Sequence, residues 1–347
     1  MSTSNPIIEL RDVSFSYDEG REKALDAVSL SVCEGDFVGV IGPSGAGKST
    51  LAAMMSGAIP HHYAGKLYGA TLVDGRDTCD VTLTDISRVV GSVLQDIDTQ
   101  MVASVVEDEM LFGLENFGVP HDKIEERLVG ALDAVGIADL REREIATLSG
   151  GQKQKVAIAA ILALEPRVLV LDEPTAALDP ASSRHVFDTL REVNEHMGIT
   201  VVVIEQKVAL LSEYCGRIVV LDHGRVTFEG TPHEVFSHGE ELRAMGVDSP
   251  RVARVSNSLA CHGVIEQGLP CLNVAEATAL VAGLVGTGHA SEGSARTPAA
   301  SPHVPAARPH AEGAEPVVEL SGVNFSYPGG GASVRNLEMR VYPGELV

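Results

Sequence analysis

Short apolar runs alternate with glycine-rich or helix-starting sequence through most of the chain. The segment Ile7–Val38 contains the β-type runs IIELRDVSF and GDFVGVIG, separated by the turn-like DEGREK. Further apolar runs occupy Phe37–Ile41, Val168–Leu171 and Val201–Ile204, and each precedes a glycine or the start of a helical pattern. This order predicts an α/β fold with a mainly parallel sheet covered by helices.

The pattern changes in the later part of the chain. IVVLD and RVTFEG flank His223–Gly224 and predict a hairpin, and a helix is expected to begin near Pro232. A mildly helical stretch follows around Asn273–Leu284, and the Ala-, Pro-, His- and Ser-rich segment after it is typical of a flexible linker. We therefore expect a first domain at 1–245, a helical extension at 246–288 and a linker at 289–315.

An internal repeat lies beyond this linker. VVELSGVNFSY at Val317–Tyr327 matches IIELRDVSFSY at Ile7–Tyr17, and PGELV at Pro343–Val347 matches EGDFV at Glu34–Val38. Two unrelated amphipathic strands are the alternative, but the ordered matches favour the start of a second, truncated copy of the first domain at 316–347. This segment has too little apolar surface for an independent core.

Composition narrows the functional classes. The 347 residues carry a net charge of −22, a poor match to a nucleic-acid backbone. The five cysteines form no CxxC pair and are expected to be reduced cytosolic thiols. The N-terminus does not resemble a signal peptide, and no stretch reaches the roughly 18 apolar residues of a spanning helix. Any role at a membrane is expected to come through partners.

The first chemical motif is GPSGAGKST, between the run ending at Ile41 and a helix expected near Lys48. It fits GxxxxGK[ST], in which glycine N–H groups and the helix N-terminus surround phosphate oxygens. Lys48 would reach the β- and γ-phosphates, and the Ser49 hydroxyl would bind Mg²⁺. A glycine-rich turn without a ligand is the alternative.

The second motif, VLVLDE, places Asp172 and Glu173 at the end of a buried strand, where ligands of open α/β sheets bind. Asp172 would hold Mg²⁺, and Glu173 would polarise the water that attacks the γ-phosphate. An apolar strand ending in two acids is common, so this assignment depends on the phosphate loop.

The third motif is LSGGQKQKVAIAAILA at Leu148–Ala163. Ser149 can cap the helix while Gly150 and Gly151 expose N–H groups to an anion, such as a γ-phosphate approaching from the opposite side. An ordinary helix cap is the alternative.

These three motifs, in this order, resemble the ATP-binding-cassette (ABC) ATPases over Ile7–Phe236. The resemblance implies a P-loop NTPase of ABC type, with a mainly parallel sheet core, an N-terminal antiparallel β subdomain and a helical subdomain carrying LSGGQ. It also implies that two cassettes meet head to tail, so that each ATP lies between the phosphate loop of one and the LSGGQ of the other. Mg²⁺ would accompany the ATP.

The resemblance also assigns single residues. Tyr17 is similar to the aromatic residue that stacks on adenine; the alternative is a buried aromatic residue at the end of a strand. Gln95 is similar to the glutamine that senses Mg²⁺ and contacts membrane subunits; the alternative is a solvated loop amide. Ala177, Leu178 and Asp179 resemble the loop that crosses the dimer interface. The expected metal ligands are Ser49, Gln95 and Asp172, and the expected catalytic residues are Glu173 and Gln206. The expected nucleotide-binding residues are Tyr17, Gly42, Pro43, Ser44, Gly45, Ala46, Gly47, Lys48, Ser49, Thr50, Gln95, Ser149, Gly150, Gly151, Gln152 and Asp179.

Two longer stretches narrow the resemblance. VLQDIDTQMVASVVEDEMLFGLEN and IPHHYAGKLYGATLVDG are similar to the ATPases of energy-coupling-factor importers, which take up vitamins and transition-metal ions. Tandem cassettes occur in that group. The implied partners are a second ABC ATPase domain and integral membrane subunits, and the implied location is the cytoplasmic face of the membrane. A metal site at His61 and His62 is disfavoured, because adjacent histidines point apart.

One position departs from the ABC pattern. Most ABC ATPases place a histidine after the strand Val201–Ile204, whereas this chain has Gln206. Glutamine cannot become cationic, so we expect slower turnover at this site, although it could also substitute adequately. The leading function is an importer ATPase. The alternatives are a soluble ABC ATPase acting in DNA repair or translation, and a degenerate partner that binds ATP with little turnover.

Overall fold

The computed structural model describes residues 6–17, 22–266, 268–286, 315–326 and 333–343. They fall into two units, Met1–Leu280 and Val281–Val347, which are described separately. Most of the expected linker, part of the turn-like DEGREK segment, Tyr327 and most of PGELV lie outside the described residues. Within the described part of the chain, no helix is long and apolar enough to cross a membrane.

The first unit begins with an antiparallel sheet in the strand order β2-β1-β4-β5. β1 pairs with β2 along one edge and with β4 along the other. Its apolar residues Ile8, Leu10, Val13 and Phe15 are buried. This confirms the expected N-terminal antiparallel subdomain. The strands are β1 (Pro6–Ser16), β2 (Leu25–Cys33), β4 (Lys66–Val73) and β5 (Arg76–Asp77).

A six-stranded sheet in the order β10-β9-β3-β8-β7-β6 forms the centre of the unit. β9, β3, β8, β7 and β6 are parallel, and β10 returns antiparallel to β9 through the predicted turn at His223–Gly224. β3 and β8 are buried along their whole length, as expected for a sheet covered on both faces. The strands are β3 (Phe37–Ile41), β6 (Val90–Val93), β7 (Val168–Asp172), β8 (Thr200–Ile204), β9 (Arg217–Asp222) and β10 (Arg225–Gly230).

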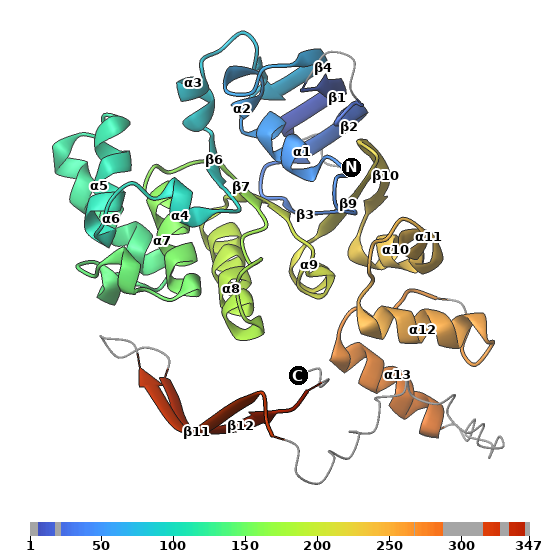
Figure 1. The fold of residues 1–347 in the computed structure, drawn as a ribbon. Coiled ribbons are helices and arrows are strands. Elements are labelled where there is room, and N and C mark those ends of the chain that lie inside the picture. Colours follow the sequence, from blue (N-terminus) through green and yellow to red (C-terminus); the bar gives the residue numbers. More distant parts are fainter. Residues whose placement is uncertain (1–5, 18–21, 267, 287–314, 327–332, 344–347) are drawn as a thin grey trace. The chain divides into compact units, whose positions relative to one another are not determined.

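Helices cover this sheet and extend beyond β6 as a helical group made of α5, α6 and α7 (Figure 1). The helices of the first unit are α1 (Lys48–Met55), α2 (Ala58–His61), α3 (Leu83–Ser87), α4 (Ile97–Gln100), α5 (Val106–Asn116), α6 (His121–Ala134), α7 (Gly150–Leu162), α8 (Pro180–Met197), α9 (Val208–Tyr214), α10 (Pro232–Ser237), α11 (Gly239–Ala244) and α12 (Arg251–Cys261). Two 3-10 turns lie at Ala138–Leu140 and Ile145–Thr147. The expected helix starts at Lys48 and Pro232 are therefore observed.

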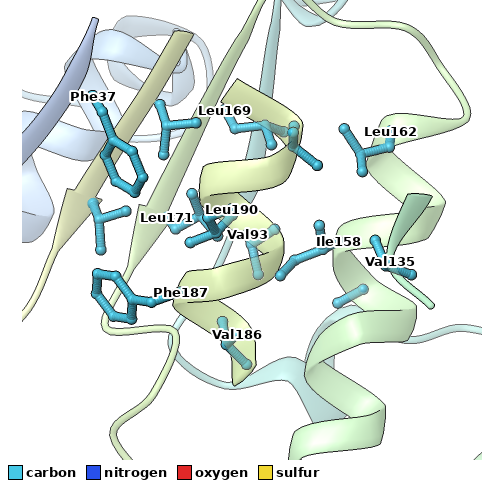
Figure 2. Packing of buried hydrophobic residues seen from close by; sticks show 14 of the residues in the cluster. Phe37, Val93, Val135, Ile158, Leu162, Leu169, Leu171, Val186, Phe187 and Leu190 are labelled. Atoms are coloured by element: carbon cyan, nitrogen blue, oxygen red, sulfur yellow. The ribbon is translucent and has the colours of Figure 1, made fainter. Parts of the chain in front are cut away.

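A continuous apolar cluster joins the helical group to the sheet. Figure 2 shows Phe187 and Leu190 of α8 lying beside Leu169 and Leu171 of β7, with Ile158 of α7 on the other side. All five side chains are fully or almost fully buried. Because α7 and α8 begin at the LSGGQ and Asp179 segments, this packing fixes the position of both segments against the sheet.

The second unit contains one antiparallel strand pair, β11 (Val318–Ser326) and β12 (Ser333–Val341). Helix α13 (Val274–Gly286) precedes it and crosses the division between the units. The helical stretch expected around Asn273–Leu284 is thus observed. Upstream, the buried residues Cys271 and Leu272 belong to the first unit, where Ser256 of α12 accepts a hydrogen bond from the Cys271 N–H at 3.0 Å.

Candidate active site

The phosphate-loop motif joins β3 directly to α1. The predicted residues Gly42, Pro43, Ser44, Gly45 and Ala46 form the loop, and Gly47 precedes the first helical residue with φ 98°. A Cβ on Gly47 would lie 2.2 Å from the carbonyl oxygen of Ala24. Only glycine fits there, because both the left-handed backbone and the close approach exclude a side chain. α1 begins directly after this loop, so the loop precedes the N-terminal N–H groups that a helix leaves without an internal partner.

Lys48 lies inside this loop with 7% of its surface exposed. Its ammonium donates to the carbonyl oxygens of Gly42 and Pro43, each at 2.9 Å. Burial lowers the pKa of Lys48, while the carboxylates of Glu173 and Asp172 oppose that shift. The structure thus brings Lys48 and the two predicted acids into one electrostatic group, although they are distant in sequence.

Asp172 ends β7 and faces the start of α1. Burial raises the pKa of its carboxyl group, and a hydrogen bond with the Ser49 side chain opposes that shift. Its Oδ1 is buried and has no hydrogen-bond partner among the described residues. A buried carboxylate oxygen beside a hydroxyl is a donor set that suits a hard divalent cation such as Mg²⁺. The residues therefore fit the predicted metal.

Glu173 lies between two glutamine amides. Gln95, in the loop after β6, donates from Nε2 to Glu173 Oε2 at 3.0 Å, and Gln206, in the loop after β8, donates from Nε2 to Oε1 at 2.7 Å. Glu173 itself has a left-handed φ of 49°, an uncommon conformation for a residue with a side chain. Gln95 is therefore not a freely solvated loop amide, because its side chain is hydrogen-bonded to Glu173.

Two charged residues that the sequence did not single out support these loops. Glu205 is buried and accepts hydrogen bonds from the N–H groups of Thr175 and Gln206, at 2.9 and 3.0 Å. Lys207 donates to the carbonyl oxygens of Thr175 and Leu178, at 2.7 and 3.0 Å. Together they join the loop that carries Gln206 to the loop that leads to Asp179. Their only signal in the sequence is a position directly after the apolar run of β8.

Tyr17 contacts Thr50, which follows the phosphate loop in α1. Its hydroxyl is 3.1 Å from the hydroxyl of Thr50, and its ring makes edge contacts with Phe15 and Tyr63. The residue is 43% exposed, so the alternative of a buried strand-end aromatic does not apply. Its exposure is compatible with the predicted stacking on a base.

The LSGGQ residues form a separate surface. Ser149 caps α7 by accepting from the Gln152 N–H at 3.3 Å, and Gln152 Oε1 accepts from the Ser149 N–H at 2.9 Å. Ser149, Gly151 and Gln152 line a cavity of about 280 Å³. Among the described residues no hydrogen bond joins 42–50 to 149–152.

The remaining predicted residues lie near this second surface. Asp179 caps α8 by accepting from the N–H groups of Ala181 and Ser182, at 2.9 and 3.0 Å. Gly150, Ala177, Leu178, Gln95 and Glu173 line a second cavity of about 580 Å³. This second cavity therefore brings Gly150 of LSGGQ beside Glu173 and Gln95, and no residue of the phosphate loop lines it.

His61 and His62 contact a backbone carbonyl and an aromatic ring. His61 Nε2 lies 2.9 Å from the carbonyl oxygen of Thr78, and the ring of His62 contacts Tyr63. In the part of the chain that the structure describes, no group of three or more His, Cys, Asp or Glu residues could hold a metal ion. The magnesium ligands proposed at Ser49 and Asp172 are of a different kind, because they include a hydroxyl.

Comparison with known proteins identifies the class of protein to which this fold and site belong. The ABC transporter family model matches residues 25–176. The energy-coupling factor transporter ATP-binding protein EcfA1 of Enterococcus faecalis is 41% identical over 261 residues, which cover 75% of this chain and 91% of that protein. The chain belongs to the family of ABC transporter ATP-binding proteins.

Solved structures of similar proteins have the same fold and belong to the same family. The structure of cbiO1 from Clostridium perfringens, part of the ABC transporter complex cbiONQ, is 31% identical with a TM-score of 0.63, covering 73% of this chain and 98% of that one. The ATP-binding cassette MJ0796, seen as a post-hydrolysis dimer with ADP and Pi, is 27% identical with a TM-score of 0.56, covering 65% and 98%. Within its family, the chain is an ATP-binding subunit of the energy-coupling factor type.

Proposed function

We propose that this chain binds Mg·ATP at the phosphate loop and hydrolyses it to drive a membrane importer of vitamins or transition-metal ions. One observation carries the catalytic part of this proposal. Glu173 lies beside Lys48 and Asp172, and its carboxylate oxygens are held by the amides of Gln95 and Gln206. A carboxylate oriented in this way beside a phosphate-binding loop can position and polarise an attacking water.

The chain's own residues would divide the work. The loop N–H groups and Lys48 would bind the phosphates, and Tyr17 would stack on adenine. Asp172, Ser49 and Gln95 would hold Mg²⁺; donation from Nε2 to Glu173 leaves Gln95 Oε1 as an oxygen ligand. When bound, Mg²⁺ would neutralise negative charge on the phosphate oxygens. Glu173 would take the proton of the attacking water.

Gln206 stands where most ABC ATPases have a histidine. Its amide can donate to a γ-phosphate oxygen, but it cannot supply a positive charge as phosphate charge develops. In addition, its Nε2 is already engaged with Glu173 Oε1. We propose that this site turns over slowly. This same observation favours a second candidate, a nucleotide-binding partner that binds ATP with little turnover.

A second cassette is required to complete the site. Among the described residues no hydrogen bond joins the phosphate loop to LSGGQ, and MJ0796 is seen as a dimer. We propose that LSGGQ of another cassette, from the same or another chain, closes over the ATP. Membrane subunits would bind the assembled pair, as the membership of cbiO1 in the cbiONQ complex supports. The chain would then lie at the cytoplasmic face of the membrane.

The experiment that tests this proposal compares Mg·ATP turnover of the purified chain alone with turnover in its complex with co-purifying membrane proteins. Turnover that appears with the membrane partners supports a transport motor. Tight ATP binding without turnover in both samples supports the degenerate partner instead. Salt-sensitive binding to nucleic acid, with no membrane partner, would contradict the transport assignment.

A further inference from the structure

Tyr63, in the segment between α2 and β4, is an exposed aromatic residue that lies against Tyr17. The two ring centroids are 6.1 Å apart, and the ring planes meet at 86°. Tyr63 is 44% exposed and Tyr17 is 43% exposed, so this contact leaves a large part of both rings open to solvent. Neighbouring exposed aromatic surfaces of this kind are common where a protein binds a planar ligand.

The segment that carries Tyr63 is fixed beside β1 by two backbone contacts. Ser16 of β1 pairs with Lys66 at the start of β4. One residue earlier, Gly65 approaches β1 so closely that a Cβ there would lie 2.3 Å from the Ser16 carbonyl oxygen. Because Tyr17 directly follows Ser16 and only Ala64 separates Tyr63 from Gly65, these contacts hold the two tyrosines together.

The aromatic pair lies next to residues that would bind phosphate in the proposed function. The Tyr17 hydroxyl is 3.1 Å from the hydroxyl of Thr50, which stands two residues after Lys48 in α1. A nucleotide whose phosphates bind at Lys48 would therefore bring its base to Tyr17 and Tyr63.

The perpendicular arrangement of the two rings decides how a base would meet Tyr63. A base stacked on Tyr17 is parallel to that ring, so it is nearly perpendicular to the Tyr63 ring. Perpendicular aromatic rings attract each other edge to face at centroid separations of about 4.5–7 Å. A purine has two fused rings and extends further past the tyrosine ring than a pyrimidine does. Its additional ring can make an edge contact that a single-ring base makes less well.

We propose that Tyr63 forms a second wall of the nucleotide-base site and favours purine over pyrimidine triphosphates. This inference rests on the proposed binding of ATP at the phosphate loop with its base on Tyr17. Tyr17 supplies the stacking face, and Tyr63 supplies a perpendicular face against the edge of the base. Stacking on Tyr17 alone discriminates poorly between bases, because every base has a π face.

The test measures the binding of Mg·ATP, Mg·CTP and inorganic tripolyphosphate to the purified full chain by isothermal titration calorimetry. Tyr63→Leu keeps an apolar side chain and removes the aromatic ring. We expect this variant to bind Mg·ATP about threefold to tenfold more weakly, because the edge-to-face contact is lost. Its loss of Mg·CTP affinity should be smaller, so that the ratio of the ATP to the CTP affinity falls. Its tripolyphosphate affinity should equal that of wild type, because the base contacts alone have changed.

Tyr68→Leu is the matched control. Tyr68 lies in β4 and is 64% exposed, and among the described residues its ring makes no contact with Tyr17. This variant should leave all three affinities unchanged. Tyr17→Leu should weaken Mg·ATP binding by at least about tenfold, because it removes the stacking face itself, and should leave tripolyphosphate binding unchanged.

The outcomes separate this inference from the proposed function. Unchanged Mg·ATP affinity in Tyr63→Leu, together with a loss in Tyr17→Leu, overturns the inference and leaves the proposed function intact. Tighter Mg·ATP binding by Tyr63→Leu also overturns it, because the ring would then cover the stacking face. An equal loss of ATP, CTP and tripolyphosphate affinity would contradict a role at the base. A wild-type chain that binds neither ATP nor tripolyphosphate contradicts the proposed function, and this inference with it.

Discussion

The side-chain amide of Gln206 donates a hydrogen bond to Glu173 Oε1 at 2.7 Å. This contact joins the residue proposed to stand in place of a histidine to the carboxylate proposed as the general base. We propose that the glutamine orients this carboxylate, although its amide cannot carry a positive charge.

Replacing Gln206 by histidine should raise the Mg·ATP turnover of the assembled transporter by about tenfold or more, because an imidazolium can stabilise charge on the γ-phosphate. Gln206→Leu should lower turnover, since it removes the hydrogen bond to Glu173 without adding a charge. Steady-state phosphate release measures both variants. Unchanged turnover in Gln206→His would show that glutamine substitutes adequately, and the proposed slow site would be abandoned.

Asp172→Asn should stabilise the metal-free protein at neutral pH while abolishing hydrolysis. Burial raises the pKa of Asp172, so the folded state binds more protons than the unfolded state between the two pKa values. Stability is therefore lost as pH rises through that window, and the loss persists above it. The asparagine variant avoids this loss.

Thermal unfolding in EDTA at pH 7 and near pH 4 measures this effect. The Tm advantage of Asp172→Asn should be larger at pH 7 than near pH 4, where the wild-type carboxyl group is more protonated. An equal advantage at both pH values would show that burial of the ionised carboxylate is not its source.

Lys207→Met should lower the free energy of unfolding by about 2–3 kcal/mol, because it leaves the carbonyl oxygens of Thr175 and Leu178 without their charged donor. Turnover should fall as well, since the loop leading to Asp179 loses its support. Lys123→Met is the matched control. It removes an exposed ion pair with Glu126 and should cost less than about 1 kcal/mol.

Denaturant unfolding of the two lysine variants decides this prediction. An equally small decrease in the free energy of unfolding for both variants would show that Lys207 does not stabilise the loop that leads to Asp179. Lys207 also donates to the Ser183 hydroxyl at 2.8 Å, whereas the Lys123 ammonium donates to the exposed carboxylate of Glu126 in its own helix.

Gly47→Ala should destabilise the fold and abolish ATP binding, because its Cβ would lie 2.2 Å from the Ala24 carbonyl oxygen in a left-handed backbone. Gly130→Ala in α6 is the control, since nothing lies within 4 Å of its Cβ position. This control should gain about 0.5–1 kcal/mol through better helix propensity. Nucleotide titration and thermal unfolding measure both variants, and unchanged ATP binding by Gly47→Ala would contradict the loop geometry.

Local sequence predicted the elements of this fold better than the contacts between them. The apolar runs ending at Ile41 and Leu171, and the motifs at their ends, predicted the strands, the phosphate loop and the helix starts, because these features depend on neighbouring residues. The family resemblance added Gln95 and Gln206, but their shared contact with Glu173 depends on the order of β6, β7 and β8 in the sheet. No local pattern encodes that order.

The supporting residues were missed for a similar reason. Glu205 and Lys207 read as ordinary charged loop residues in the sequence, yet they hold Thr175, about thirty positions earlier. The register of β11–β12, which repeats that of β1–β2, is an intermediate case. Sequence similarity indicated the repeat, whereas the register shifts and left-handed residues that the two pairs share became visible only in the paired strands.

The most direct test of the account is a single-turnover and steady-state comparison of wild type and Glu173→Gln in the assembled transporter, with ATP binding measured on the same samples. We expect Glu173→Gln to bind Mg·ATP as tightly as wild type but to hydrolyse it at about one hundredth of the wild-type rate or lower, because only the general base is lost. Undiminished hydrolysis in Glu173→Gln would contradict it and would place catalysis in another cassette.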